Sequence, residues 1–329
     1  MNILFCSAGR RCELLKDFRK TMGNSIKIVA ADLSPTAPAL YFADKTYLVP
    51  RIDDDTYIPV IIDICKKENI QAVTTLIDPE ISLLARHRSE FEEIGVEVLA
   101  PYEETAELCF DKYEMFKYLR KNNIPTVDTY GDMESFDKAW NDGEIDFPVF
   151  VKPRTGSGSV GARMIENHET LLDVMEADSS LIIQKYMGEC LDLDADVYID
   201  TISHKPVAAF SKKKLSTKIG GANKTISFKD EKLFEFIKRV LEKFKFNGPI
   251  DMDFFYKDGV YYLSEINPRF GGAYLHAYGA GVDFIKLIDN NINKIENKEL
   301  FGNYDEGVLM MMYDSVVIAR KDELVGNID

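Results

Sequence analysis

The stretch Ile250-Asp-Met-Asp-Phe-Phe-Tyr-Lys-Asp-Gly-Val-Tyr-Tyr-Leu-Ser-Glu-Ile-Asn-Pro-Arg269 carries the strongest local signal of the chain. Two segments rich in aromatic and aliphatic residues flank an Asp-Gly dipeptide, which predicts a β-hairpin. Asp253, Glu265 and Asn267 occupy strand positions that are otherwise filled by Phe, Tyr, Leu and Ile. A carboxylate is costly to bury unless it is paired or binds a cation, and oxygen ligands suit Mg²⁺ (or Mn²⁺) bridged to phosphate. The hairpin therefore predicts a metal site.

The turn of this hairpin decides which polar side chains can meet. Glu265 and Asn267 are two residues apart, so they share one face of their strand. A three-residue loop at residues 257–259 would place Asp253 on that same face, whereas a two-residue loop would place it on the opposite face. The predicted metal site therefore requires the three-residue loop. We expect Asp251 to be a solvated carboxylate.

The first hundred residues alternate short apolar segments with helical patterns, which predicts a parallel sheet covered by helices on both faces. The expected strands are Ile3–Cys6, Ile26–Ala31, Lys45–Val49, Ala72–Leu76 and Val96–Leu99, with helices near Tyr57–Lys67 and Glu80–Ile94. Ligands of such sheets bind at the carboxyl ends of the strands. Arg10 and Arg11 lie there and could clamp a carboxylate, and Glu80 could receive an amine. The alternative is a capped helix start with solvated charges.

A Gly/Ser loop follows the expected strand Pro148–Lys152 and contains Gly156, Ser157 and Gly158. Backbone N–H groups of such a loop can approach phosphate oxygens closely, and Lys152 adds positive charge. The order differs from the P-loop, because the lysine precedes the glycines. The alternative is a flexible loop with an exposed lysine.

The expected strand Leu181–Gln184 runs into Lys185, Tyr186 and Met187. Such a crossing can present backbone groups to the edge of a purine while Met187 packs against its ring. Asp192 follows and could accept hydrogen bonds from ribose hydroxyls. A plain domain linker would have a similar sequence.

A basic segment at Lys212–Lys224 includes Lys214 and a Gly-Gly pair. We expect this segment to be a loop. It could order over phosphates or an acceptor substrate, with Lys214 as a candidate contact, or it could be a mobile surface loop.

The overall composition narrows the class of protein. The 329 residues carry a formal charge of −15, with 46% hydrophobic residues, five cysteines and four histidines. An acidic surface repels nucleic acid and anionic membranes, and no apolar run reaches the roughly 20 residues of a membrane helix. Scattered cysteines and histidines without ligand spacing indicate reduced thiols and argue against zinc. We therefore expect a cytoplasmic protein that binds neither nucleic acid nor membrane.

Taken in order, the motifs resemble the ATP-grasp superfamily, and within it short proteins similar to one synthetase unit of carbamoyl phosphate synthase large chain. They are Asp111-Lys112, Val151-Lys152-Pro153 with the Gly/Ser loop, Gln184-Lys-Tyr-Met187, Asp253-Phe254 and Glu265-Ile-Asn-Pro-Arg-Phe-Gly-Gly272. The resemblance implies a mixed α/β and α+β fold. A Rossmann-like pre-ATP-grasp domain (residues 1–105) would precede a small ATP-grasp subdomain (106–186) and a larger one with the metal hairpin (187–329).

The resemblance also implies site roles. Lys112 and Lys152 would contact the ATP phosphates together with the loop residues Gly156, Ser157 and Gly158. Gln184, Lys185, Tyr186 and Met187 would line the adenine, and Asp192 would face the ribose, a role that Glu189 or Asp194 could take instead. Arg269 would stabilise an acyl-phosphate and the tetrahedral species that follows. The family often has Glu at the position of Gln184, but only backbone groups are needed there.

The activity that the resemblance implies is ATP- and Mg²⁺-dependent activation of a small-molecule carboxylate, followed by attack of an amine or another nucleophile. The alternatives are a carbamoyl phosphate synthase-like subunit and a non-catalytic nucleotide-binding protein. A nicotinamide-dependent dehydrogenase is disfavoured, because Ser7-Ala-Gly-Arg-Arg11 lacks the Gly-x-Gly-x-x-Gly pattern. A homodimer is a family-level expectation.

Overall fold

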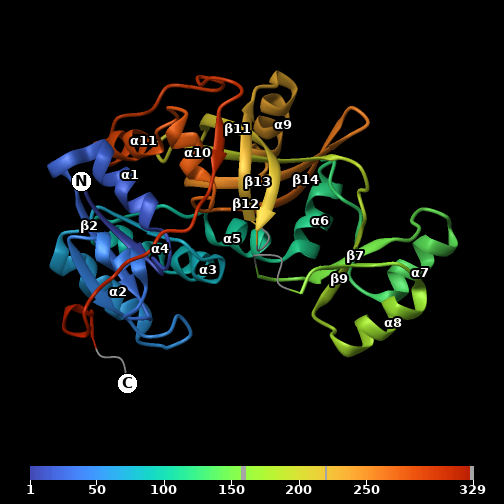
Figure 1. Ribbon diagram of the computed structural model, residues 1–329, viewed down its shortest axis with the longest axis horizontal. Coiled ribbons are helices and arrows are strands. Elements are labelled where there is room, and N and C mark those ends of the chain that lie inside the picture. Colours follow the sequence, from blue (N-terminus) through green and yellow to red (C-terminus); the bar gives the residue numbers. More distant parts are fainter. Residues whose placement is uncertain (157–160, 219–220, 327–329) are drawn as a thin grey trace.

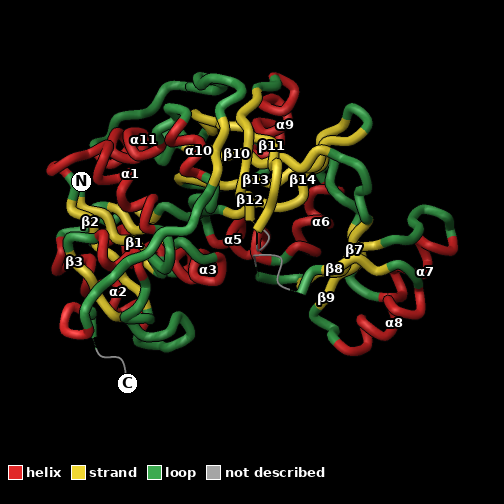
Figure 2. Tube along the Cα trace, viewed as in Figure 1, coloured by secondary structure: helices red, strands yellow, loops and turns green. Residues whose placement is uncertain are grey.

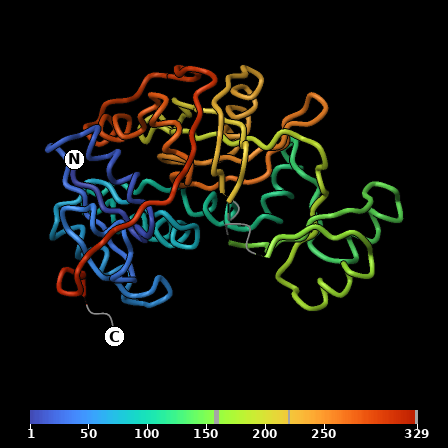
Figure 3. Tube along the Cα trace, in the orientation of Figure 1, coloured from blue at the N-terminus to red at the C-terminus, as the bar shows by residue number. Residues whose placement is uncertain are grey.

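The computed structural model describes residues 1–156, 161–218 and 221–326 and contains three sheets (Figures 1 and 2). The front sheet lies at one end of the long axis, the smallest sheet at the other end, and the largest sheet between them (Figure 2). In Figure 3, the N-terminal segment (blue) accordingly lies far from the segment near residue 150 (green). The combination of one parallel sheet with antiparallel sheets in this chain confirms the expected α/β and α+β fold. In these described ranges, no helix combines the length and hydropathy needed to cross a membrane.

The front sheet is parallel, with the strand order β3-β2-β1-β4-β5. Its strands are β1 (Asn2–Cys6), β2 (Lys27–Asp32), β3 (Lys45–Leu48), β4 (Ala72–Thr75) and β5 (Glu97–Val98). Alternate residues of β1 enter two different cores, with Ile3 and Phe5 in one and Leu4 and Cys6 in the other. The sheet is therefore covered on both faces, as the apolar strands predict.

The helices of this domain are α1 (Cys12–Met22), α2 (Tyr57–Glu68), α3 (Asp78–Arg86) and α4 (Arg88–Glu93). The expected helix Glu80–Ile94 is wrong as a single element, because it breaks at His87. Arg88 donates hydrogen bonds to the carbonyl oxygens of Val98 and Pro101, both at 3.1 Å, and these bonds hold α4 against the end of β5.

The small sheet has the order β6-β9-β7-β8. It contains β6 (Thr129–Tyr130), β7 (Val149–Pro153), β8 (Arg163–Ile165) and β9 (Leu181–Lys185). The helices α7 (Met133–Asn141) and α8 (His168–Ala177) cover it and share its own core around Phe136 and Leu171. Helices α5 (Glu103–Phe110) and α6 (Lys112–Lys121) connect the front sheet to this unit.

The large sheet is antiparallel, with the order β14-β13-β10-β11-β12-β15. Its strands are β10 (Leu191–Ile199), β11 (Pro206–Lys218), β12 (Gly221–Phe228), β13 (Gly248–Lys257), β14 (Val260–Asn267) and β15 (Leu309–Met311). Helix α9 (Glu231–Leu241) contributes six buried side chains to the core that also holds the apolar face of this sheet. Helices α10 (Tyr274–Gly279) and α11 (Phe284–Ile292) follow β14.

The basic segment Lys212–Lys224 is not a loop, contrary to the sequence prediction. Lys212 to Lys218 form the second half of β11, and β12 begins at Gly221, with residues 219 and 220 outside the described ranges. Lysine is a weak strand former, so local propensity does not reveal this strand. Lys212 and Lys214 alternate with outward residues, and both point to one face, where aspartates of β10 neutralise them.

The hairpin β13–β14 differs from the prediction at its turn. Lys257 pairs with Val260, so the loop contains only Asp258 and Gly259, both with positive φ (50° and 81°). Such a two-residue turn matches the strand twist. The prediction of a three-residue loop is therefore wrong. A β-bulge at Ser264 supplies the extra residue instead, because Phe254 pairs with Leu263 while Asp253 pairs with Glu265.

Candidate active site

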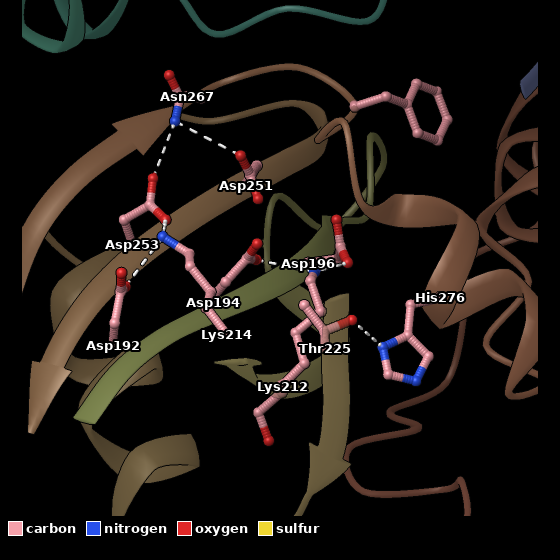
Figure 4. Close-up of polar contacts among 12 residues, drawn as sticks. Asp192, Asp194, Asp196, Lys212, Lys214, Thr225, Asp251, Asp253, Asn267 and His276 are labelled. Atoms are coloured by element: carbon pink, nitrogen blue, oxygen red, sulfur yellow. Dashed lines mark hydrogen bonds and ion pairs between the residues drawn. The ribbon is translucent and has the colours of Figure 1, made fainter. Parts of the chain in front are cut away.

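The polar face of the large sheet gathers the hairpin residues. Asp253 lies opposite Glu265, and Asp251 lies opposite Asn267, so all four side chains share one face. The Asn267 Nδ2 atom is 3.5 Å from one carboxylate oxygen of each aspartate (Figure 4). The bulge thus brings together the three residues that the sequence proposes as metal ligands.

Two lysines of β11 neutralise this face. The Lys214 Nζ atom is 3.0 Å from an Asp192 oxygen and also pairs with Asp253 (Figure 4). Lys212 is 0% exposed, and its Nζ lies 2.8 Å from Asp194 and pairs with Asp196. The register places Asp194 opposite Lys212, and the Lys214 side chain reaches Asp192 through an ion pair, so opposite charges face each other across β10 and β11.

Asp251 is buried rather than solvated, which corrects the sequence expectation. The strand β13 is not an edge, because β10 pairs with its other side and places Asp196 opposite Asp251. Burial and the neighbouring Asp194 and Asp253 carboxylates raise the pKa of Asp251 well above its usual range. Burial likewise raises the pKa of Asp196 to about 6, although Lys212 opposes the shift.

Two lysines approach the hairpin from the small sheet and helix α6. The Lys112 Nζ lies 4.0 Å from a Glu265 oxygen and donates a hydrogen bond to the Gly156 carbonyl. Lys152 lies in β7 and is partly buried; burial lowers the pKa of its amine, while the Glu265 carboxylate opposes that shift. Burial raises the pKa of Glu265, and Lys112 and Lys152 counteract it. Ser157 and Gly158, also predicted at this place, lie outside the described residues.

An ion pair missed by the sequence analysis anchors the start of the Gly/Ser loop. Asp111 caps helix α6 by accepting hydrogen bonds from the backbone N–H groups of Tyr113 and Glu114, both at 3.0 Å. Arg154 approaches both oxygens of the same carboxylate at 2.8 Å from its Nε. The sequence alone could predict Asp111 as the N-cap of a helix, since Asp is favoured there. Its pairing with Arg154 could not be predicted, because it is a tertiary contact.

The hinge between the small and large sheets holds Gln184, Lys185, Tyr186 and Met187. The Gln184 side chain is buried and donates to Thr129 Oγ1 at 3.0 Å. Tyr186 is 44% exposed, whereas Met187 is 9% exposed. A groove of about 700 Å³ borders residues 185–187 on one side, and residues 123–128 and the tip of the β13–β14 hairpin on the other.

The front domain contributes charges to the same centre. The Arg269 Nε is 2.8 Å from Asp78 Oδ1, and its Nη2 donates to Asp78 Oδ2 at 3.1 Å. Burial and the neighbouring Arg269 charge lower the pKa of Arg11 to about 10, and a Cβ atom on Gly272 would lie 3.3 Å from its Nη1. Arg11 thus joins the site, whereas Arg10 is exposed.

Glu80 lies inside the front domain instead of facing the site. It is 0% exposed, accepts a hydrogen bond from Thr75 Oγ1 at 2.6 Å and pairs with the Tyr57 hydroxyl. An amine cannot reach this carboxyl in the structure, which argues against the predicted contact. Asp78, two residues earlier, instead lines a small cavity together with Cys109, Gly156, Glu265, Asn267 and Pro268.

Two family descriptions match the chain. Residues 3–99 match the PylC-like N-terminal domain, and residues 109–273, half of the chain, match the ATP-grasp domain. A D-alanine–D-alanine ligase of Clostridium botulinum is 29% identical over 239 residues, which cover 64% of this chain and 76% of that protein. The carbamoyl phosphate synthase large chain of Pseudothermotoga lettingae is 24% identical over 242 residues, covering 69% of this chain and 21% of that protein.

A solved structure has the same fold. The biotin carboxylase domain of the 2-oxoglutarate carboxylase from Hydrogenobacter thermophilus superposes with a TM-score of 0.73 at 19% identity. The match covers 94% of this chain and 73% of that one. That domain was solved as a dimer with MgADP, ADP and bicarbonate.

Proposed function

Because this chain belongs to the ATP-grasp family, we propose that it is an ATP- and Mg²⁺-dependent ligase. It activates a small-molecule carboxylate as an acyl-phosphate and couples it to an amine or another nucleophile, forming a carbon–nitrogen bond in the first case. The observation that carries the proposal is the shared face of Asp253, Glu265 and Asn267, faced by Lys112 and Lys152.

The donor set fits Mg²⁺, and Mn²⁺ offers the same coordination chemistry. Asp253 and Glu265 offer carboxylate oxygens and Asn267 would bind through its amide oxygen, and Mg²⁺ in nucleotide sites is bound by one or two carboxylates plus phosphate oxygens. In the structure, Lys112 lies 4.0 Å from Glu265 and Lys214 pairs with Asp253, so these carboxylates face cationic groups. The bound ion would neutralise charge on the phosphates.

The chain's own residues position and neutralise the reacting groups. Lys112 and Lys152 hold the phosphates of ATP, and Gln184–Met187 and Asp192 hold the adenosine. An oxygen of the substrate carboxylate attacks the γ-phosphorus, and the bond to the β-phosphate oxygen breaks, which releases ADP. The nucleophile then attacks the acyl carbon, loses a proton and expels phosphate. Arg269 stabilises the negative charge that develops at the acyl centre.

The substrate acid binds between the front domain and the hairpin. Arg11 from the front domain and Arg269 from the hairpin place two guanidinium groups at one end of this space, and guanidinium groups pair well with carboxylates. The small cavity near these groups is lined by Asp78 of the front domain and by Glu265 and Asn267 of β14.

An ADP-release screen that crosses carboxylates with amines tests the proposed function. The wild type should release ADP only when a matching acid, Mg²⁺ and ATP are all present, and Glu265→Gln should lose this activity. Undiminished turnover in Glu265→Gln would overturn the assignment of the hairpin. ATP binding without ADP release across the whole screen would favour a non-catalytic nucleotide-binding protein. The expected homodimer stays a prediction, which light scattering checks.

A further inference from the structure

The guanidinium of Arg269 is held by a residue of another domain. Asp78 begins helix α3 shortly after strand β4 of the front sheet, whereas Arg269 follows strand β14 of the large sheet. The Nη2 atom donates a hydrogen bond to Asp78 Oδ2 at 3.1 Å, and the Nε atom forms an ion pair with Oδ1 at 2.8 Å. One hydrogen bond and one ion-pair contact thus join the carboxylate to the guanidinium.

Water is largely excluded from this contact. The side chains of Arg269 and Asp78 are 11% and 12% exposed. An ion pair that is mostly buried is screened little and fixes geometry, whereas an exposed pair contributes almost nothing. Within the part of the chain that the structure describes, Asp78 is the carboxylate at ion-pair distance from Arg269.

Further contacts connect Arg269 to the proposed metal ligands. Arg269 Nη2 lies 3.5 Å from Asn267 Oδ1, and Asn267 Nδ2 lies 3.5 Å from Asp253 Oδ2. Asp78 also lines the small cavity that contains Glu265 and Asn267. A carboxylate of the front domain is therefore connected, through Arg269 and Asn267, to the place where phosphate and acid meet.

We propose that Asp78 is a positioning residue, which aims Arg269 at the acyl centre and makes catalysis depend on the docking of the front domain. This inference rests on the proposed function, since it assigns Arg269 to the acyl-phosphate. Asp78 acts through Arg269 and takes no part in nucleotide binding, because Lys112, Lys152 and the hinge residues have no hydrogen bond or ion pair with it in the described structure.

Asp78→Asn removes the charge at nearly constant shape and tests the proposal. Loss of orientation should lower kcat about 10- to 100-fold, while the dissociation constant of ATP stays within about twofold of the wild type. Combined with Arg269→Lys, Asp78→Asn should add no further loss, because the residue acts only through Arg269. Glu107→Gln is the matched control, since it breaks an exposed pair with Arg86 at 3.1 Å in the same region and should leave kcat unchanged.

A second readout does not need turnover. The guanidinium NMR signals of Arg269, assigned by their absence in Arg269→Lys, should show slower rotation in the wild type than in Asp78→Asn, where only the contacts with the Phe270 carbonyl and Asn267 remain. Unchanged signals in Asp78→Asn, losses that multiply in the double variant, or a kcat equal to that of Glu107→Gln would overturn the proposal. If the wild type releases no ADP, the proposed function fails, and the signals still decide whether Asp78 holds Arg269.

Discussion

Asp253 lies directly opposite Glu265 although a two-residue turn joins their strands, because a bulge at Ser264 shifts the register of β14 by one residue. In a regular hairpin with this turn, the two carboxylates would face opposite sides of the sheet. The bulge therefore creates the acidic pair on which the proposed chemistry depends. Bulges next to active sites often re-aim a side chain in this way.

Deletion of Ser264 should keep the acidic pair intact. Without this residue, Glu265 follows Leu263 directly and pairs with Asp253 in a regular ladder. We expect Mg²⁺-dependent ATP binding, measured by calorimetry, to persist in the deletion variant and in the control Ser264→Ala, which keeps the bulge. A folded deletion variant that binds ATP without any response to Mg²⁺ would refute the register argument.

Lys212→Met should destabilise the fold strongly. The lysine is fully buried between Asp194 and Asp196, so its loss leaves buried carboxylates without a counter-charge. Breaking such a pair costs about 3–5 kcal/mol. The matched control is Lys213→Met on the other face of β11, which is only partly buried and should cost less than about 1 kcal/mol. Equal losses of the free energy of unfolding in urea for the two variants would show that the pairing of Lys212 with Asp194 and Asp196 does not stabilise the fold.

Gly271 should not tolerate even a methyl group. A Cβ atom there would lie 2.7 Å from Asp251 Oδ1 and 2.9 Å from Asp196 Oδ1, both of which belong to buried side chains. Gly271→Ala should reduce the free energy of unfolding by about 1–3 kcal/mol. Gly279→Ala is the control, because nothing lies within 4 Å of its Cβ position, and it should be neutral or stabilising. The explanation fails if both variants unfold at the same denaturant concentration.

His276 should make stability depend on pH. Its Nδ1 lies 2.7 Å from Thr225 Oγ1 and its Nε2 lies 3.0 Å from the Val308 carbonyl, so the neutral ring is satisfied on both sides. Burial and the nearby Lys212 charge lower the pKa of His276 to about 4. The stability from the neutral ring is therefore present above the ordinary pKa near 6.5 and is lost as the pH falls toward 4.

Unfolding measured between pH 7.5 and 4.5 checks this sign. His276→Gln should show a shallower fall in stability over that window than the wild type. The exposed His204 provides the comparison, since its backbone has a positive φ that Asn tolerates. An acid-induced loss that is the same in the wild type and His276→Gln, or that disappears in His204→Asn, would contradict the role of His276.

Much of the fold was predictable because its signals are local. The apolar strands of the front sheet, the Asp-Gly turn and the polar residues of the hairpin all follow from spacing along the chain. The bulge was not predictable, because Ser264 stands in an unbroken strand pattern and nothing nearby marks it as the extra residue. Asp253 and Glu265 therefore share one face as predicted, although the three-residue loop that the prediction required is absent.

The remaining errors concern contacts between distant segments. Asp251 looks like an edge residue in the hairpin alone, and it is buried only because β10 pairs with the far side of β13. The segment from Lys212 looks like a basic loop until the aspartates of β10 are placed beside it. Asp78 and Glu80 stand at the same strand end, and only the tertiary structure shows that Asp78 faces Arg269 while Glu80 points inward.

The most direct measurement uses the acid identified by the ADP-release screen, labelled with ¹⁸O in its carboxylate. An acyl-phosphate pathway breaks the carbon–oxygen bond of the acyl-phosphate, so each turnover should transfer one ¹⁸O atom from the acid to inorganic phosphate, detected by mass spectrometry. Both the label and ADP should disappear with Glu265→Gln. Phosphate that is free of ¹⁸O while the ligated product forms would contradict activation of the carboxylate as an acyl-phosphate.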